Sequence, residues 1–288
     1  MNNYIIYTDS GCDIKPSLLQ EWGVQYSCLI FRFDDADVEY SNDDMDITTF
    51  YDKMRAGGIA KTSAINIEKF TVEFEKWLKQ GFDILYLGFS GGLSATYNSA
   101  YIAADQLREE YPERKIITVD TLSASAGQGL LLYLTVEQKK NGATIEEAAA
   151  YAESIKQSIC HWVTMDDLVY LKRGGRISST AAFFGNTLSI KPIIHVDNEG
   201  HLINVSKVRG RKSSLSTLAN KYGELAMDPA NGTIFISHSD CEKDVEELAK
   251  LLKSKYDATV DVVTDIGPVI GAHTGPGAIA IFFVGKER

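Results

Sequence analysis

The first 158 residues alternate short apolar segments with longer segments of helical periodicity, and this alternation limits the possible folds more than any other feature. The apolar segments are short enough for strands, and the segments between them are long enough to cross over a sheet. This order is typical of a parallel sheet covered by helices. The expected strands are 4–8, 24–33, 82–87 and 115–120, and the expected helices are 48–55, 67–80, 94–110, 125–140 and 144–158.

The second half has a different pattern. Segments 188–196 and 201–208 flank Asp197-Asn198-Glu199-Gly200, which indicates a β-hairpin and therefore antiparallel pairing. A length of 288 residues suits two domains. We expect an α/β protein with an N-terminal three-layer domain (1–158) on a mainly parallel sheet and a C-terminal α/β domain (159–288) with a mixed sheet. In the latter, helices are expected at 212–227 and 242–255, and further strands at 233–237, 259–264 and 278–284.

The composition argues against several classes of function. Lys and Arg number 29 against 39 Asp and Glu, a formal net charge of −10, so the chain is a poor candidate for binding nucleic acid. The cysteines Cys12, Cys28, Cys160 and Cys241 form no C-x-x-C pair, which argues against zinc and against a disulfide framework. No basic leader precedes the first strand, and no apolar run approaches the roughly 18 residues of a membrane span. We therefore expect a cytoplasmic protein without metal or membrane span.

Four loops after expected strands are rich in Gly, Ser and Thr, and ligands of α/β sheets bind at this edge. Ser94 opens the expected helix 94–110, and Thr62 and Ser63 precede the helix 67–80. The other loops are 121–125 and 272–277, and the latter contains His273. Each hydroxyl could simply cap a helix, and His273 fits a structural role as well as a ligand contact. Four such loops together favour a site for a singly charged carboxylate, held by hydroxyls and free helix N–H groups.

One of these loops permits a different interpretation. Gly88-Phe89-Ser90-Gly91-Gly92 matches the G-x-S-x-G nucleophile elbow, in which Ser90 would be the nucleophile of a serine esterase. All five histidines lie downstream, as that mechanism permits. However, three residues separate Ser90 from the expected helix, and no HGGG-type segment precedes it. A third hypothesis, a phosphotransfer component, lacks the G-x-x-x-x-G-K-[ST] motif of nucleotide-binding loops.

A concentration of positive charge stands out in this acidic chain. Leu171-Lys172-Arg173-Gly174-Gly175-Arg176-Ile177-Ser178 holds three cationic side chains and two glycines. Glycine allows the backbone to approach a ligand or partner closely. The segment is either a docking or anion-gating loop or a solvated turn, and its charge contrast with the rest of the chain favours the first.

Several segments occur together in the order that is found in one known family. Over nearly its whole length, the chain resembles the DegV family of bacterial fatty-acid-binding proteins. Each motif alone is weak, but their order and spacing are specific. The matching segments are Asp9-Ser10-Gly11-Cys12-Asp13, Lys61-Thr62-Ser63, Ser90-Gly91-Gly92-Leu93-Ser94-Ala95-Thr96-Tyr97, Asp120-Thr121, Ser125-Ala126-Gly127, Leu171 to Ile177, Ile190-Lys191-Pro192-Ile193 and Gly271-Ala272-His273-Thr274-Gly275-Pro276-Gly277.

The resemblance implies a non-catalytic two-domain α/β protein that buries a long-chain fatty acid, such as palmitate, in a tunnel between its domains, with no further cofactor. It implies that Thr62 and Ser94 hold the carboxylate through their hydroxyls, with Ser63 and His273 as further ligand-binding residues. Some members are carrier subunits that present the acid to an ATP-binding fatty acid kinase subunit. By that likeness, Arg173 would dock the partner.

Two departures from the family pattern leave the proposed contacts in place. Segment 64–66 lacks the proline that often follows the T-S pair, and Ala95 stands where a glycine often follows the key serine.

Burying a methylene contributes about 0.8 kcal/mol, so about 15 of them supply roughly 12 kcal/mol before binding costs. A buried carboxylate still needs partners. The candidates for the wall around the tail are Phe89, Leu93, Ile102, Phe183, Phe184 and Ile270.

Overall fold

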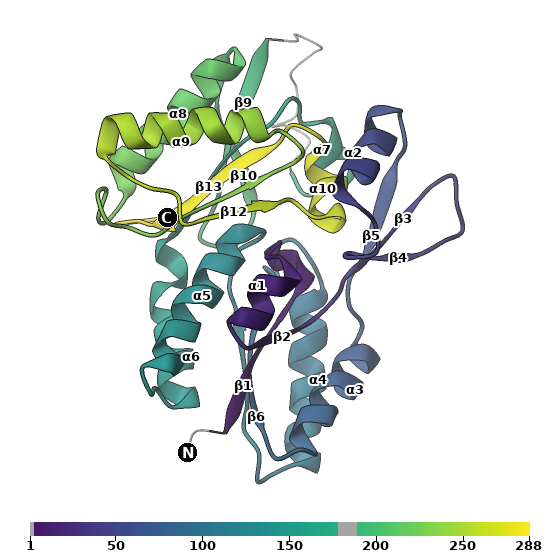
Figure 1. Ribbon diagram of the computed structural model, residues 1–288. Coiled ribbons are helices and arrows are strands. Elements are labelled where there is room, and N and C mark those ends of the chain that lie inside the picture. Colours follow the sequence, from purple (N-terminus) through teal and green to yellow (C-terminus); the bar gives the residue numbers. More distant parts are fainter. Residues whose placement is uncertain (1–2, 178–188) are drawn as a thin grey trace.

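In the computed structural model, which describes residues 3–177 and 189–288, the first half of the chain builds a four-stranded sheet (Figure 1). Its strands are β1 Tyr4–Asp9, β2 Val24–Ser27, β6 Asp83–Gly88 and β7 Ile116–Asp120. They run parallel in the order β2-β1-β6-β7. The central strands β1 and β6 are buried almost throughout, as expected of a sheet covered on both faces.

Helices cover both faces of this sheet. In Figure 1, α3 and α4 lie on one side of it, and α5 and α6 lie on the other. Local signals set their ends: the side chain of Asn66 caps α3, and Thr144 forms a capping box with Glu147 at the start of α6. The predicted three-layer arrangement is confirmed. The helices of this half are α1 Pro16–Glu21, α3 Ile67–Leu78, α4 Thr96–Glu110, α5 Ala126–Lys140 and α6 Ile145–Ile155.

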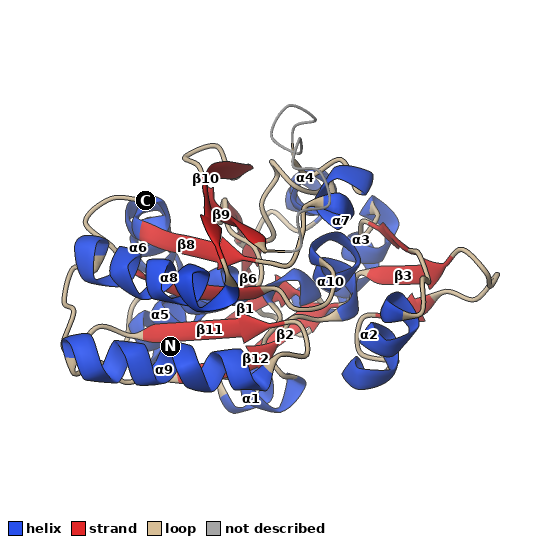
Figure 2. Ribbon diagram, turned by 90° about the horizontal axis from the view of Figure 1, so that it is seen from above, coloured by secondary structure: helices blue, strands red, loops and turns tan. Residues whose placement is uncertain are grey.

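The second half forms a six-stranded mixed sheet, also as predicted. Its strands are β8 Ile159–Thr164, β9 Ile190–Val196, β10 Leu202–Arg209, β11 Ile234–His238, β12 Val262–Asp265 and β13 Ile279–Val284. Their order is β10-β9-β8-β13-β11-β12, and the recorded pairings are antiparallel except β11 with β12. Two helices, α8 Arg211–Leu225 and α9 Glu242–Tyr256, lie side by side over this sheet (Figure 2). Residue 188, the expected first residue of β9, lies outside the described residues.

Helix α5 packs against both sheets. It contacts β6 of the first sheet and β8, β11 and β13 of the second. Its first seven residues are all buried, as expected of a helix without a solvent face. Two glycines permit the close packing: a Cβ would come within 2.2 Å of His161 at Gly127 and within 2.5 Å of Ile14 at Gly129.

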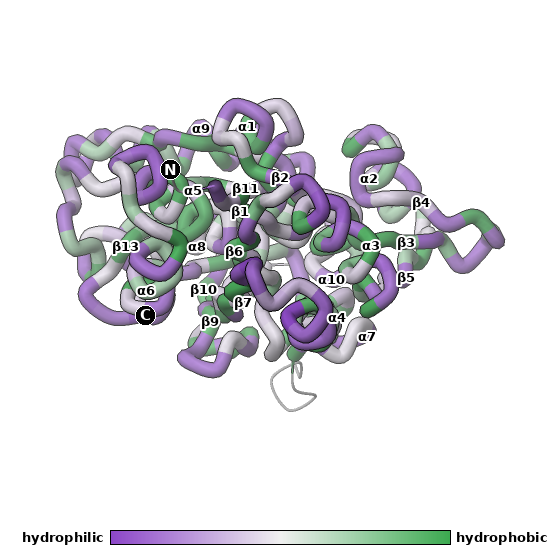
Figure 3. The backbone as a smooth tube through the Cα atoms, turned by 90° about the horizontal axis from the view of Figure 1, so that it is seen from below, coloured by the Kyte–Doolittle hydropathy of each residue, from purple (hydrophilic) through white to green (hydrophobic). Residues whose placement is uncertain are grey.

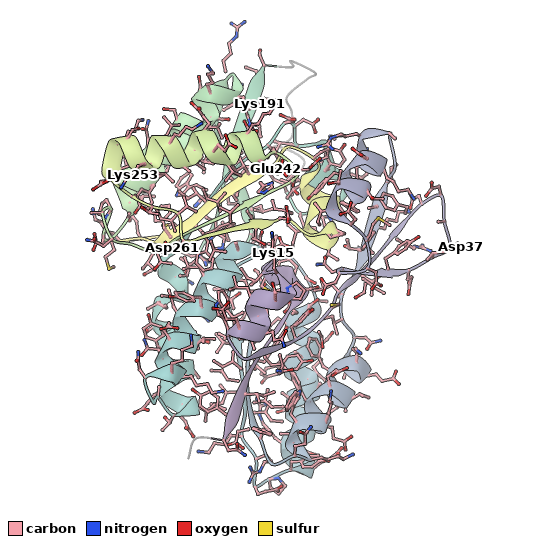
Figure 4. The ribbon with its side chains drawn as sticks, viewed as in Figure 1. Lys15, Asp37, Lys191, Glu242, Lys253 and Asp261 are labelled. Atoms are coloured by element: carbon pink, nitrogen blue, oxygen red, sulfur yellow. The ribbon has the colours of Figure 1, made fainter. Side chains whose placement is uncertain are left out.

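A small arm projects beside the two sheets (Figure 1). It consists of β3 Ile30–Phe33, β4 Tyr40–Ser41 and β5 Ala60–Ser63, which pair antiparallel in the order β4-β3-β5, together with α2 Ile47–Arg55. The loop at its end is mostly hydrophilic (Figure 3), and Asp37 lies there (Figure 4). The hydroxyl of Tyr51 on α2 lies 2.7 Å from the carbonyl oxygen of Ile266, so the arm is also fixed to the second half.

The arm corrects two expectations. The segment 24–33 is not one strand, because the backbone N–H of Leu29 donates to Ser10 Oγ (2.9 Å), and the strands on either side belong to different sheets. Residues 61–63 do not form a loop before a helix either. They belong to β5, where Thr62 pairs with Phe31 of β3.

Two short helices complete the second half: α7 Val169–Arg173 and α10 Pro268–Thr274. Residue His273 therefore lies on a helix rather than in the expected loop, because Pro268 occupies a first-turn position that suits a residue without an N–H. None of the helices within the described ranges is long and apolar enough to cross a membrane. Lys15 and Asp265, 3.6 Å apart, join the two halves near the position of Lys15 in Figure 4.

Candidate functional site

A cavity of about 190 Å³ lies between the two sheets and is lined by side chains of both halves and of the arm. This volume far exceeds the roughly 10–15 Å³ that one water molecule requires. The polar residues of its wall are Thr62, Ser63, Ser94, Ser125, His161, Arg176, Ser237, His273 and Thr274. The remaining wall is apolar: Leu29, Ala64, Phe89, Leu93, Ala95, Ala124, Val163, Met165, Leu171, Val196, Leu202, Ile266, Val269, Ile270, Ala280 and Phe282.

Side chains from distant parts of the sequence meet in one polar group, which we call the head cluster: Thr62, Ser94, Arg176 and His273. Thr62 Oγ1 lies 2.8 Å from Nε2 of His273. The Nδ1 edge of the same ring faces Gly174, where a Cβ would come within 2.0 Å. Arg176 donates from Nη1 to the carbonyl oxygen of Gly174 (2.5 Å) and from Nε to that of Leu93 (3.1 Å), next to Ser94. These contacts hold β5, α10, the segment after α7 and the segment before α4 together.

The electrostatics of the head cluster favour a neutral histidine. Burial, and to a lesser degree the charge of Arg176, lower the pKa of His273 to about 4. At neutral pH the ring therefore carries one proton, on one of its two nitrogens. His273 Nδ1 has no hydrogen-bond partner in the structure. If the proton is on Nε2, it is donated to Thr62 Oγ1, and the hydroxyl proton of Thr62 is then available to a ligand in the cavity.

Ser94 lies before α4 on a segment that the buried carboxylate of Asp9 and the half-buried carboxylate of Asp120 hold in place. The helix begins at Thr96, two residues later than expected, and the N–H of Thr96 donates to Ser94 Oγ (3.2 Å). Asp9 accepts hydrogen bonds from the N–H of Phe89 (2.9 Å) and the hydroxyl of Tyr86 (2.6 Å). Burial raises the pKa of Asp9, while these donors oppose the rise. Farther along, Asp120 accepts from the N–H of Gly91.

The structure distinguishes the two roles that the hydroxyl loops could have, which are helix capping and contact with a ligand in the cavity. Ser94 does accept one N–H of the first helical turn, so a capping contact and exposure to the cavity coexist. Thr62 and Ser63 cap no helix, because the side chain of Asn66 caps α3. Both instead line the cavity from the edge strand β5.

The basic segment divides into an inner and an outer arginine. Arg176 lines the cavity, a role that sequence reasoning did not assign to it, although the motif that contains it was recognised. Arg173 is exposed and does not line the cavity. Its guanidinium carbon lies 5.6 Å from the ring centre of Tyr170. The last residue of the segment, Ser178, lies outside the described residues.

Three of the six residues considered for the tail wall do line the cavity: Phe89, Leu93 and Ile270. Ile102 does not, since it is part of α4 and lies away from the cavity wall. The remaining two, Phe183 and Phe184, lie outside the described residues. The strand residues Val163 and Ala280 were missed. They form part of the wall because alternate side chains of β8 and β13 face α5 rather than α8.

The esterase interpretation finds no support in the surroundings of Ser90. Its side chain is fully buried, and Oγ donates to the carbonyl oxygen of Gly200 (2.9 Å) instead of to a histidine. The histidines make other contacts: His273 with Thr62, for example, and His161 with the carbonyl oxygen of Ile159. In the part of the chain that the structure describes, no group of three or more His, Cys, Asp or Glu side chains could hold a metal ion.

The fold and the site define an α/β protein with a parallel and a mixed sheet that enclose a largely apolar cavity with a polar head cluster. A family model described as "Uncharacterised protein, DegV family" matches residues 4–286. The chain belongs to the DegV family.

Relatives extend over almost the full length of the chain. A DegV domain-containing protein of Clostridium perfringens is 44% identical, with 100% of this chain and 99% of the relative covered. A fatty acid-binding protein of Thermotoga maritima is 31% identical over 98% of each chain. A solved structure of a DegV family protein from Thermus thermophilus, described by its fatty acid binding, superposes with a TM-score of 0.87 at 28% identity, covering 98% of this chain and 99% of that one.

Proposed function

We propose that this protein binds one long-chain fatty acid, such as palmitate, with its tail in the cavity between the sheets. The observation that carries the proposal is the joining of an apolar cavity to the head cluster of hydroxyl, imidazole and guanidinium groups. Two relatives that are described as binding fatty acids support it. We also propose residues 1–158 and 159–288 as the two domains that enclose the ligand.

The carboxylate would be held by the hydroxyls of Thr62 and Ser94, with Ser63 and His273 as further contacts. All four residues line the cavity. Arg176, which the structure adds, places a positive charge beside them and so offsets part of the cost of burying a carboxylate. The neutral ring of His273 orients Thr62 without forming an ion pair with the ligand. The protein would act as a carrier that changes no bond in the fatty acid.

Mass spectrometry of the intact protein under native conditions tests the proposal. Protein purified from bacteria should carry one fatty acid per chain, which denaturation releases and which can then be identified. Protein that is purified without any lipid, and that takes up none when incubated with palmitate, would contradict the proposal.

We further propose that an ATP-binding fatty acid kinase subunit is the partner of this carrier in the cytoplasm, and that Arg173 contributes to docking. The exposed Arg173 precedes Gly174, which contacts His273, so a partner at Arg173 would lie beside the head cluster. The test is ATP-dependent phosphorylation of the bound acid by such a subunit. Arg173→Ala should slow the reaction while fatty acid occupancy stays constant. Lys172→Ala, an exposed neighbour of equal charge, is the matched control.

An equal rate for the wild type and Arg173→Ala would remove Arg173 from the docking surface. A subunit that phosphorylates free palmitate as fast as palmitate bound to this protein would contradict the carrier role itself.

A further inference from the structure

The short helix α10, which carries His273, is capped by side chains from distant parts of the chain. Its N-cap residue, Gly267, has no side chain with which to cap the helix. The caps come instead from the first half. Asp13 Oδ1 accepts from the N–H of Gly267 (2.9 Å), and Asn42 Oδ1 accepts from the N–H of Val269 (3.0 Å).

A third side chain of the first half completes this arrangement, which we call the clamp: Asp13, Asn42 and Tyr51. The hydroxyl of Tyr51 on α2 donates to the carbonyl oxygen of Ile266, 2.7 Å away. Residue 268 is a proline and has no N–H. The clamp therefore binds the carbonyl of residue 266 and both of the N–H groups that residues 267–269 possess.

The clamp can reach the backbone of α10 because two glycines face it. A Cβ at Gly267 would come within 2.7 Å of Asn42 Nδ2 and within 3.0 Å of Asp13 Oδ1. A Cβ at Gly271 would come within 2.5 Å of the hydroxyl of Tyr51. The three clamp side chains thus contact the helix directly, and their positions determine where it lies.

The clamp residues are buried but do not line the cavity between the sheets. On their other side, Asp13, Asn42 and Gly267 line a second cavity of about 280 Å³. Side-chain packing around the start of α10 is therefore incomplete, and the hydrogen bonds of the clamp supply part of what packing does not.

The position of α10 determines the contact between His273 and Thr62. Asn42 and Tyr51 belong to the arm, and so does Thr62 on β5. Helix α10 contacts β3, β5 and α2 of the arm (Figure 1). The N–H that Asn42 accepts lies four residues before His273, about 6 Å along a helix that rises roughly 1.5 Å per residue. A shift of α10 by about 0.5 Å would carry the Thr62–His273 pair, now 2.8 Å apart, out of the preferred hydrogen-bonding range.

We propose that Asn42 and Tyr51 are positioning residues for the fatty acid carboxylate. With Asp13, they hold α10 so that His273 orients the hydroxyl of Thr62 toward the head of the ligand. This inference rests on the proposed fatty acid binding and adds residues that do not touch the ligand. A merely structural role would change the affinity for every ligand of the cavity, whereas a positioning role affects only a ligand with a carboxylate head.

The experiment compares palmitate with hexadecanol, which has the same number of carbons and no carboxylate. Dissociation constants of the full-length, delipidated chain are measured by displacement of a dansyl-labelled fatty acid, whose own affinity is determined for each variant. Tyr51→Phe and Asn42→Ala should each bind palmitate about three- to tenfold more weakly than the wild type, the contribution of one hydrogen bond. Their affinity for hexadecanol should stay within twofold of the wild type.

The matched control is Tyr222→Phe. Tyr222 is also buried, and its hydroxyl donates to the carbonyl oxygen of Pro229 (3.0 Å) away from the cavity. This variant loses a hydrogen bond of the same kind and should bind both ligands as the wild type does.

A double-mutant cycle tests whether the clamp acts through Thr62. In the Thr62→Ala background, Tyr51→Phe should weaken palmitate binding less than twofold, because the hydroxyl that the clamp positions is already absent. Equal weakening of both ligands, unchanged palmitate binding, or an undiminished loss in the Thr62→Ala background would overturn the inference. Failure of palmitate to bind the wild type would instead overturn the proposed function, and the inference with it.

A second measurement needs no ligand. In ¹⁵N spectra of ligand-free protein labelled at histidine, Tyr51→Phe and Asn42→Ala should shift the Nε2 resonance of His273, because its contact with Thr62 changes. Tyr222→Phe should leave this resonance in place. An unchanged resonance in both clamp variants would contradict the inference.

Discussion

The head cluster and the apolar wall of the same cavity are built in different ways. The head cluster combines Thr62 of β5, His273 of α10 and two segments that lie outside regular elements, so its geometry depends on contacts between distant parts of the chain. The apolar wall takes much of its surface from strands and from the core around α5. From this comparison we expect the apolar wall to supply most of the binding free energy of the fatty acid. We expect the head cluster to set the orientation of its carboxylate.

Removal of both hydroxyls from the head cluster should have the largest effect. In Thr62→Ala/Ser94→Ala, the carboxylate loses two hydrogen bonds of about 1.5–3 kcal/mol each. Affinity for palmitate should fall roughly 100-fold or more, measured by displacement of a fluorescent fatty acid. The control is Ser213→Ala/Thr217→Ala on α8, away from the cavity. Unchanged affinity in the Thr62/Ser94 variant would place the carboxylate elsewhere.

The buried His273 makes the stability of the ligand-free protein depend on pH. Its pKa is about 4 in the fold against an ordinary 6.5, so between these values the unfolded chain binds a proton that the folded chain does not. The free energy of unfolding should therefore fall as the pH drops through this window, by up to about 3 kcal/mol. In urea titrations at pH 7 and pH 4, His273→Gln should lose less stability on acidification than the wild type. The same loss in both proteins would contradict a neutral, buried His273; the exposed His201→Gln serves as control.

A substitution in the apolar wall should change which tail fits rather than whether the head binds. Ala280→Leu adds three carbons to a cavity-lining position. Long acids should lose about 2 kcal/mol, since three methylenes of about 0.8 kcal/mol each are displaced. Mass spectrometry of co-purified fatty acids should show a shift toward shorter chains. Ala230→Leu, at an exposed position, should leave the distribution unchanged. An unaltered distribution in Ala280→Leu would mean that the tail takes another path.

The smallest effect is expected outside the cavity wall. Ser90→Ala removes the hydrogen bond to the carbonyl of Gly200 and should lower the free energy of unfolding by about 1 kcal/mol, measured by urea denaturation. Palmitate affinity should not change. Any ester hydrolysis by the wild type that disappears in this variant would revive the esterase interpretation.

Periodicity predicted both sheets, because strands and crossover helices leave local patterns in the sequence. The segment 24–33 and the segment 61–63 were assigned wrongly for a common reason. The arm depends on pairing between residues about thirty positions apart, such as Phe31 with Thr62, and local patterns contain no signal for it. Likewise, the apolar residues before His273 gave no sign of the short helix α10.

The head cluster was partly predictable. Thr62, Ser94 and His273 were singled out from hydroxyl-rich loops and from the family resemblance, and all three line the cavity. Arg176 was not singled out, although its motif was recognised, because spacing alone could not tell which arginine turns inward. That choice follows from the hydrogen bonds of Arg176 to the carbonyl oxygens of Gly174 and Leu93.

The position of α5 has a consequence for how the chain could be divided. A fragment that starts at residue 159 would leave bare the inner faces of β8, β11 and β13, which α5 covers. The matching N-terminal fragment would expose the first turns of α5, all buried in the intact chain. Each fragment would expose a large apolar surface and tend to aggregate. When they are expressed together, the two fragments should instead associate and restore the native fold.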